Sequence, residues 1–329
     1  MTREVVKTNI VVICFNALSY TKATINSLFS KTKNAYFLTI IDNGSYDDTK
    51  KYIDQIKLPT NCVKLTVIRN EHNMGVGHAY NQGFLVSIAK GIEYTCFCNN
   101  DLYFSSDWLD KLEAYLDTHP NVAMVNPLRP STSTIYDGSF STMDKLMQIK
   151  ETDKWRGELT HFTEMPVSRF DVFCKKIIKQ NCEYYKKEDV VLKFPDALST
   201  CVCLVRNTFI NKLTEFADPI FKGYGGEDID TCWRVMFQGY DCAINREVYV
   251  HHFRGKSLKV NGLNRQKLLL ASNELLYDRW KDQISQFARN EMVLNVDVES
   301  KLAKTTNNEY WLLSQLNRGI DILGEIRNE

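Results

Sequence analysis

Short apolar segments alternate with segments of helical periodicity from residue 8 to about residue 126 of this 329-residue chain. We predict strands at residues 9–15, 36–41, 63–69, 95–98 and 122–125, with helices between successive strands. Residues 10–15 are the longest unbroken apolar run, which is typical of a strand buried on both faces. This alternation indicates an α/β fold with a doubly wound, mainly parallel sheet, which binds ligands at the carboxyl ends of its strands.

The composition excludes several classes of protein. The chain is 44% hydrophobic and 25% charged, as in globular proteins that bury a sizeable core. Its longest apolar run is far shorter than the ~20 residues that a membrane span needs, and no leader-like cleavage site follows it. With 41 basic and 40 acidic side chains, the chain has no overall positive field for a nucleic-acid backbone. We therefore expect a cytoplasmic protein with no transmembrane segment and no nucleic-acid partner.

The ten cysteines stand mostly singly or as the pairs Cys96/Cys98 and Cys201/Cys203. None has the C-x2-C spacing of a zinc site, and their arrangement is not that of a secreted disulfide framework. Both pairs lie in apolar, strand-like runs, where alternate side chains point the same way. We expect reduced and mostly buried thiols.

The regular alternation ends near residue 127. A charged, mostly helical-looking insertion occupies residues 141–193, and strand character returns at 197–206. Residues 264–287 repeat apolar side chains at helical spacing, which predicts a packing helix. We therefore divide the chain into residues 1–128, residues 129–262 with the insertion, and a C-terminal helical segment at 263–329.

Polar residues and glycines follow each of the first four predicted strands. In chain order these sets are Asn16, then Asp42-Asn43-Gly44-Ser45, then Asn73-Met74-Gly75-Val76-Gly77, and then Asn99-Asn100-Asp101. Because the carboxyl ends of parallel strands share one edge of the sheet, we expect the four sets to line one crevice. Turn chemistry alone is the alternative for the set at 42–45 and for the set at 99–101, since Asp, Asn and Gly favour turns.

In order and spacing these sets resemble glycosyltransferase family 2, whose members have the GT-A fold, a Rossmann-like sheet flanked by helices. The resemblance rests on residues 11–16, 41–45, 73–83 and 99–101, and on two later signals. These signals are Gly223-Tyr-Gly-Gly-Glu-Asp228-Ile-Asp230 with Arg234, and His252 with Ser257. The resemblance covers about residues 8–126 and 196–257. It implies an enzyme that passes a sugar, with inversion, from a uridine or deoxythymidine diphosphate sugar to an acceptor hydroxyl.

The resemblance implies that residues 1–128 bind this nucleotide-sugar donor. Asp42 would accept a hydrogen bond from the nucleotide base, and the backbone near residues 13–15 would flank the base. The full set of implied donor-binding residues is Ile13, Phe15, Asn16, Asp42, Asn73, Gly75, Asn81, Asn99 and Asn100. Residues 129–262 would bind the acceptor and provide the catalytic base.

Asp101 is the residue that the resemblance assigns to a divalent cation, Mn2+ or Mg2+, which would bridge the two phosphates of the donor. Asn99 stands where the family's Asp-x-Asp motif has its first carboxylate, a variant found in rhamnosyltransferase-like members. His252 is the expected second ligand, because a neutral imidazole coordinates divalent ions. A strand-end histidine packed beside His251 is the alternative, and the single carboxylate leaves metal dependence open.

Asp228 is the expected catalytic base, because inversion needs one group to take the proton of the attacking hydroxyl. Glu227 is the second candidate for this role. Crowded carboxylates raise one another's pKa, which suits a base that works near neutral pH. The alternative is an acidic helix start that is solvated and stabilised by the helix dipole.

Two other functions fit parts of the pattern. A binding protein that keeps the nucleotide pocket without turnover is consistent with Asn99, although pure binding does not need the Glu227–Asp228 pair. A sugar-nucleotide pyrophosphorylase would need a Gly-rich loop with Arg and Lys after the first strand, where this chain has Cys14-Phe15-Asn16-Ala17. For the transferase, we expect an acceptor hydroxyl on a glycan, a lipid-linked glycan or a protein. Peripheral membrane contact and a homodimer through the C-terminal helices also fit the sequence.

Overall fold

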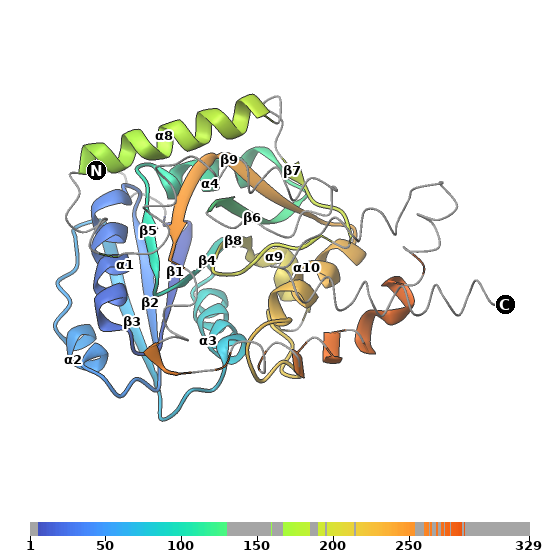
Figure 1. Ribbon diagram of the computed structural model, residues 1–329, viewed down its shortest axis with the longest axis horizontal. Helices are drawn as coiled ribbons and strands as arrows, with labels where there is room; N and C mark the ends of the chain where they lie inside the picture. Colours follow the sequence, from blue (N-terminus) through green and yellow to red (C-terminus); the bar gives the residue numbers. More distant parts are fainter. Residues whose placement is uncertain are drawn as a thin grey trace.

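The computed structural model describes residues 6–129, 167–184 and 190–253 except 195 and 214, together with residue 159 and scattered positions between 260 and 286. Its described residues form a sheet of nine strands in the order β3-β2-β1-β4-β8-β6-β9-β5, with β7 paired to β9 (Figure 1). The strands are β1 (Thr8–Cys14), β2 (Tyr36–Asn43), β3 (Cys62–Asn70), β4 (Tyr94–Asn99), β5 (Leu102–Phe104), β6 (Val122–Leu128), β7 (Val190–Val191), β8 (Val202–Arg206) and β9 (Asp241–His252). The helices are α1 (Leu18–Lys31), α2 (Thr49–Asp54), α3 (Val76–Ala89), α4 (Trp108–Thr118), α8 (Val167–Tyr184), α9 (Asn207–Ile210) and α10 (Glu227–Phe237).

The sheet confirms the predicted α/β class, and its strand directions differ between the two halves of the chain. Strands β3, β2, β1 and β4 pair in parallel, as the alternation predicts. Beyond β4, strand β8 runs antiparallel to both β4 and β6, while β6 and β9 are parallel. One sheet therefore joins residues on both sides of position 128, and the carboxyl ends of β4 and β6 lie beside the start of β8.

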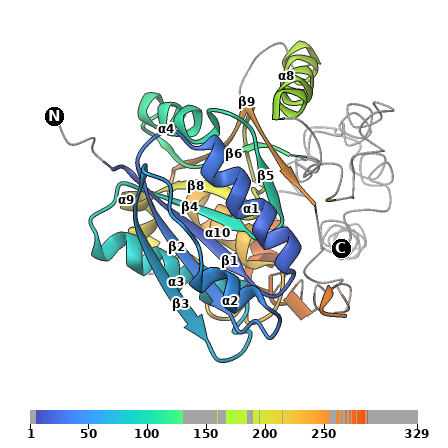
Figure 2. The ribbon, with the colours of Figure 1, turned by 90° about the vertical axis from the view of Figure 1, so that its left-hand side faces the viewer.

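The apolar run of β1 is buried because it separates two hydrophobic cores. Ile10, Val12 and Cys14 face one core, which α1, α2 and α4 cover. Val11 and Ile13 face the other core, which α3, α8 and α10 cover. Figure 2 shows α1 and α2 on one face of the parallel strands. Alternate side chains of one strand thus enter different cores, and every residue of β1 is buried.

The connection from β1 to α1 has an unusual backbone. Asn16 and Ala17 both have positive φ angles, 53° and 58°, which L-residues rarely adopt. The Asn16 side chain stabilises this turn, because its Oδ1 accepts a hydrogen bond of 2.8 Å from the backbone N–H of Tyr46. The N–H of Leu18 in turn donates to Asp47 Oδ2 at 3.2 Å. The loops after β1 and β2 therefore hold each other in place at the edge where we expect ligands.

Part of the predicted insertion at 141–193 is described, and it confirms the helical pattern there. Helix α8 lies along one side of the sheet (Figure 1), with Phe170 and Phe173 buried in the core. Lys31 of α1 donates to Asp171 of α8 at 3.0 Å. Residues 130–158, 160–166 and 185–189 lie outside the described part, as does the tail beyond 286.

The structure also describes most of the cysteines, and it describes helices whose length and composition can be examined. The nine cysteines that the structure describes are all free and buried, as expected. Within the same described residues, none of the helices combines the length and the apolar composition required to cross a bilayer.

Candidate active site

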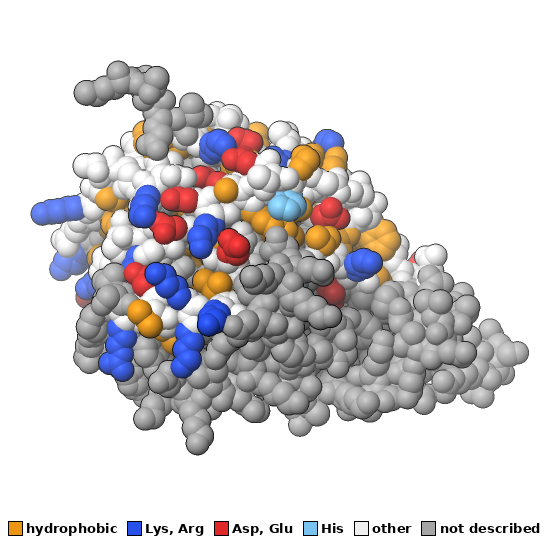
Figure 3. Space-filling model, turned by 90° about the horizontal axis from the view of Figure 1, so that it is seen from above, with side chains coloured by type: hydrophobic (Ala, Val, Ile, Leu, Met, Phe, Trp, Pro, Cys, Tyr) orange, Lys and Arg blue, Asp and Glu red, His pale blue; other side chains and the backbone are white. Residues whose placement is uncertain are grey.

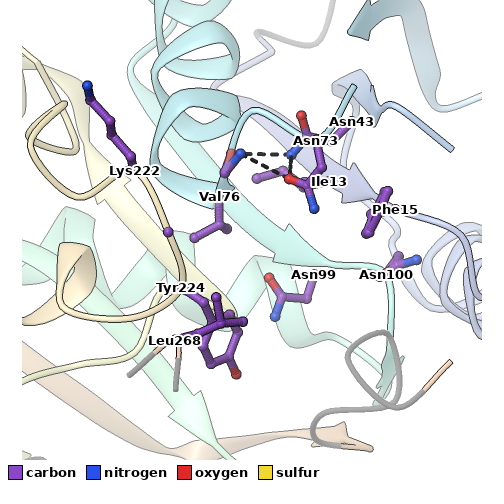
Figure 4. A pocket seen from close by; sticks show the side chains of 12 residues that line it. Ile13, Phe15, Asn43, Asn73, Val76, Asn99, Asn100, Lys222, Tyr224 and Leu268 are labelled. Atoms are coloured by element: carbon purple, nitrogen blue, oxygen red, sulfur yellow. Dashed lines mark hydrogen bonds between the residues drawn. The ribbon is translucent and has the colours of Figure 1, made fainter. Parts of the chain in front are cut away.

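A cavity of about 310 Å3 opens at the carboxyl ends of β1, β2 and β4. It lies within the size range of small-molecule sites, although at its lower end. The residues that line it are Ile13, Phe15, Asn43, Asn73, Gly75, Val76, Asn99, Asn100, Lys222, Gly223, Tyr224 and Leu268 (Figure 4). One wall thus comes from the parallel strands, and the facing wall comes from residues 222–224 and Leu268.

Amide side chains fix the wall on the side of β2. Asn43 donates to Asn73 Oδ1 at 2.9 Å and to the Gly75 carbonyl at 3.2 Å, and Figure 4 shows these bonds as dashed lines. The Oδ1 of Asn43 accepts from Met74 N–H at 3.1 Å and from Asn70 at 2.8 Å. Three of these four bonds hold loop 73–75 against the cavity, and the fourth attaches Asn43 to the end of β3.

The turn at Gly75 brings two distant segments into contact. Gly75 has a φ angle of +86°, and a Cβ atom there would lie only 2.5 Å from the carbonyl oxygen of Lys222. Both the backbone conformation and the close approach therefore require glycine at this position. Gly75 and Gly77 of the predicted motif thus lie where the two walls of the cavity come into contact.

Six of the nine implied donor-binding residues line the cavity, namely Ile13, Phe15, Asn73, Gly75, Asn99 and Asn100. The other three lie outside its lining and have structural partners. Asp42 is buried and accepts from Ser45 N–H at 2.9 Å, which is the turn chemistry weighed as the alternative. Asn81 exchanges two hydrogen bonds with the backbone of Ala217, at 2.7 and 2.9 Å. Asn16 holds the loop after β2.

Asp101, which is buried, and His252, which is partly buried, form a pair beside Asn100 of the cavity lining. Asp101 follows β4 and is 2% exposed, while His252 is the last residue of β9. The Nε2 atom of His252 lies 3.0 Å from Asp101 Oδ1, and Leu102 pairs with His252 in the sheet. Burial lowers the pKa of His252, but the charges of Asp101 and Cys201 outweigh burial and raise it to about 10. Burial also raises the pKa of Cys201, yet Arg129 and His252 lower it to about 6.

The Asp101–His252 pair would offer one carboxylate and one imidazole to a divalent cation. Mg2+ usually takes one or two carboxylates with water and substrate phosphates. Because its pKa is raised to about 10, His252 is protonated at neutral pH and would bind a cation only after losing that proton. Within the described residues, no group of three or more His, Cys, Asp and Glu side chains is arranged to hold a metal ion. A cation here therefore needs the phosphates of the donor as further ligands.

Glu227 and Asp228 begin helix α10, directly after the loop that forms the second wall. Glu227 is 5% exposed, and its Oε2 has no hydrogen-bond partner among the described residues. Burial and the neighbouring charge of Asp228 raise the pKa of Glu227 to about 8. Burial also raises the pKa of Asp228, while the N–H of Ile229 and the charge of Arg129 oppose this rise. Asp228 is partly exposed whereas Glu227 is buried, so only Asp228 resembles the solvated helix start considered above.

The sequence reasoning missed several residues around this site. Asn43 and Val76 stand inside the quoted motifs, but we assigned them no role. Lys222 directly precedes the signal at 223–230, and Gly223 and Tyr224 begin it, but we assigned no donor contact to these three residues. In Figure 4, the Lys222 side chain extends away from the other lining residues. Leu268 gave no signal beyond helical periodicity. Ser257 of the motif lies outside the described residues.

The surface agrees with the balanced charge of the sequence. On the face shown in Figure 3, Lys and Arg side chains lie beside Asp and Glu side chains rather than in one field of a single sign.

The family model described as Glycosyl transferase family 2 matches residues 9–180, just over half of the chain, so the chain belongs to this family. A curated relative described as an uncharacterized glycosyltransferase, from Haemophilus influenzae, is 22% identical over 153 residues. That match covers 46% of this chain and 44% of the relative. The chain therefore spans less than half the length of this relative.

Solved structures show the same fold at low sequence identity. The Pyrobaculum calidifontis mannosyltransferase PcManGT, in complex with GDP-Man and Mn2+, has a TM-score of 0.50 at 12% identity. The match covers 76% of this chain and 57% of the mannosyltransferase. S. aureus TarS 1–349 in complex with UDP-GlcNAc has a TM-score of 0.50 at 13% identity, over 96% of this chain and 73% of TarS 1–349. The fold of this chain is thus the GT-A type that the sequence predicted.

Proposed function

We propose that this protein is an inverting glycosyltransferase that moves a sugar from a uridine or deoxythymidine diphosphate sugar to an acceptor hydroxyl. The acceptor would be a glycan, a lipid-linked glycan or a protein side chain. One observation carries the proposal. The cavity at the carboxyl edge of the sheet is lined by Asn99 and Asn100, which directly precede Asp101, and by residues 222–224, which lie a few positions before Glu227 and Asp228. Membership of the family and the donor complexes of the structural neighbours support this assignment.

The donor would occupy the cavity with its base against Ile13 and Phe15. The amide N–H groups of Asn73 and Asn99 would donate to the nucleoside and the phosphates, whereas Asn100 would offer its Oδ1, because its N–H groups already donate to the Asn16 carbonyl and the Thr21 hydroxyl. Asp101 and His252 would hold a Mn2+ or Mg2+ ion, which, when bound, draws negative charge from the leaving diphosphate. Of the residues implied for the donor, Asp42, Asn16 and Asn81 act in this proposal through the loops that they hold.

Asp228 would act as the base. In the transfer step its carboxylate takes the proton of the acceptor hydroxyl, while that oxygen forms a bond to the anomeric carbon and the bond to the diphosphate breaks. Burial and the charge of Asp228 raise the pKa of Glu227 to about 8, so in this proposal Glu227 keeps its proton at neutral pH and Asp228 would be the ionised member of the pair. Arg129 favours that ionised form, because its positive charge lowers the pKa of Asp228.

The experiment is a transfer assay with a panel of nucleotide sugars and acceptor glycans, read out as release of the nucleoside diphosphate. We expect release with one class of donor, and a product whose anomeric configuration, assigned by NMR, is opposite to that of the donor. Retention of configuration would contradict the role of Asp228. Tight donor binding without release, across a broad acceptor panel, would favour the non-catalytic binding protein.

A further inference from the structure

Asp230 lies two residues after the proposed base, yet it is shielded from solvent. Its side chain is 0% exposed, and both carboxylate oxygens are taken by neighbours. Arg234 Nε donates to Oδ2 at 2.7 Å. The indole N–H of Trp280 donates to Oδ1 at 2.9 Å, and Arg279 Nε lies 3.0 Å from the same atom. Asp230 therefore has no free oxygen for a substrate proton or a metal ion.

These bonds attach a distant part of the chain to the start of helix α10. Trp280 and its neighbours belong to the Trp280 segment, which we define by the described residues Leu268, Ser272, Leu276, Arg279, Trp280 and Ile284. Figure 1 shows this segment in orange-red beside α10. The Trp280 ring packs edge-on against Trp233 at 5.5 Å and stacks on Phe237 at 5.3 Å, and both partners belong to α10.

The same segment touches the loop that forms the second wall of the cavity. Ser272 is buried and donates to the carbonyl oxygen of Tyr224 at 3.2 Å. A Cβ atom at Gly226 would lie 3.4 Å from the Cβ of Ser272, and one at Gly223 would lie 3.9 Å from its hydroxyl. The glycines of this loop thus leave room for the segment. Leu268, at its beginning, lines the cavity itself.

A buried carboxylate is retained only where charges and hydrogen bonds compensate for its lost hydration. Here the compensation comes from Arg234 of the same helix and from two residues that lie about 50 positions further along the chain. The placement of loop 222–226 therefore depends on the contacts that Asp230 makes with Trp280 and Arg279 of the Trp280 segment.

We propose that Asp230 is a positioning residue: it holds Trp280 and Arg279, so that Ser272 and Leu268 set the second wall of the cavity. This inference rests on the proposed function only for the identity of the ligand. According to this proposal, the Trp280 segment is a part of the donor site. Asp230 then has a role distinct from that of Asp228.

The test compares two tryptophans that make similar bonds in different places. Trp280→Phe keeps the ring packing against α10 and removes the N–H that Asp230 accepts. Trp108→Phe is the matched control, because Trp108 is also buried and donates to Thr32 at 3.0 Å from the opposite core. Asp230→Asn is a second variant, which keeps an acceptor for Trp280 but removes the charge that faces Arg234 and Arg279.

Two readouts are measured on the full chain. The first is hydrogen–deuterium exchange of peptides that cover residues 222–226, without ligand. The second is the dissociation constant for UDP or dTDP with Mn2+. We expect faster exchange and about fivefold weaker binding in Trp280→Phe, the loss that one ordinary hydrogen bond produces. Asp230→Asn should change both readouts in the same direction.

The control separates positioning from a general loss of stability. Trp108→Phe should lower the melting temperature by a similar amount while leaving exchange at 222–226 and nucleotide affinity unchanged. If Trp280→Phe and Asp230→Asn behave as Trp108→Phe does, the proposal is overturned. If the unmodified chain binds no nucleoside diphosphate, the proposed function fails, whereas the exchange data still decide the role of Asp230. If Trp280→Phe does not fold, Ser272→Ala takes its place, because it removes only the hydrogen bond to Tyr224. Unchanged hydrogen–deuterium exchange at residues 222–226 in both Ser272→Ala and Asp230→Asn would then refute the proposal.

Discussion

Glu227 gives the sharpest test of the electrostatics at the start of α10. Its carboxyl group is 5% exposed, and burial and the charge of Asp228 raise its pKa from 4.5 to about 8. The folded chain therefore binds this proton more tightly than the unfolded chain does. The resulting stabilisation is fully present below the ordinary pKa of 4.5 and is lost as the pH rises through about 8.

The magnitude follows from the size of the shift. Each pKa unit corresponds to roughly 1.4 kcal/mol, so the site should cost the folded state about 3 kcal/mol between pH 5 and pH 8. In Glu227→Gln no proton is exchanged, and this loss disappears. The two proteins should be about equally stable at pH 5, whereas at pH 8 the variant should melt about 6 °C higher, at roughly 2 °C per kcal/mol.

The assay is thermal unfolding of both proteins at half-unit steps from pH 5 to pH 8. Other groups titrate in both proteins and largely cancel in the difference between them. Glu71→Gln is the control, because Glu71 is exposed to solvent. A difference between Glu227→Gln and the unmodified protein that stays constant over this range would refute the reasoning, because Glu227 would then ionise as an exposed carboxyl does.

Three further predictions concern the cavity and the proposed chemistry. Asp228→Asn should lower kcat by roughly 100-fold or more while nucleotide affinity stays near that of the unmodified protein, and a variant that keeps most of its turnover would exclude Asp228 as the base. Asp101→Ala should weaken nucleoside diphosphate binding in calorimetry with Mn2+ but not with EDTA; an equal loss in both would indicate a structural role. Gly75→Ala should weaken nucleotide binding and lower the melting temperature, because its Cβ would meet the Lys222 carbonyl oxygen at 2.5 Å. Gly239→Ala is its control, since Gly239 has a similar φ of +84° and open space around it, and only stability should fall there; equal binding in the two variants would contradict the contact at Lys222.

The first half of the fold was predictable because its signals are local. The apolar run of β1 and the alternation that follows it identify parallel strands with helices between them, and β1 to β4 pair in that way. The antiparallel position of β8 between β4 and β6 was not predictable, because register and direction depend on partners about 80 to 110 residues away. Strand β5 has only three residues and leaves no periodicity to detect.

In the candidate site, too, some features follow from local sequence patterns and others depend on distant residues. Residues at the ends of predicted strands, such as Phe15 and Asn99, line the cavity as expected, because strand topology alone brings them to one edge. The residues Asp228 and Asp230 look alike in the sequence, yet one is partly exposed and the other is enclosed by Trp280. Asn81 likewise has the position of a ligand contact in the motif but bonds to Ala217. Such differences arise from long-range packing, which a local pattern does not record.

The most direct test of the account is a thermal-shift screen of the purified protein against UDP, dTDP, GDP, CDP and ADP, each with Mn2+ and with EDTA. A ligand at 100 times its dissociation constant stabilises the folded state by about 2.7 kcal/mol, which is readily measured. We predict a shift with UDP or dTDP that is larger with Mn2+ and is reduced by Asp101→Ala. No shift with any of the five nucleotides would contradict the assignment of the cavity as a donor site.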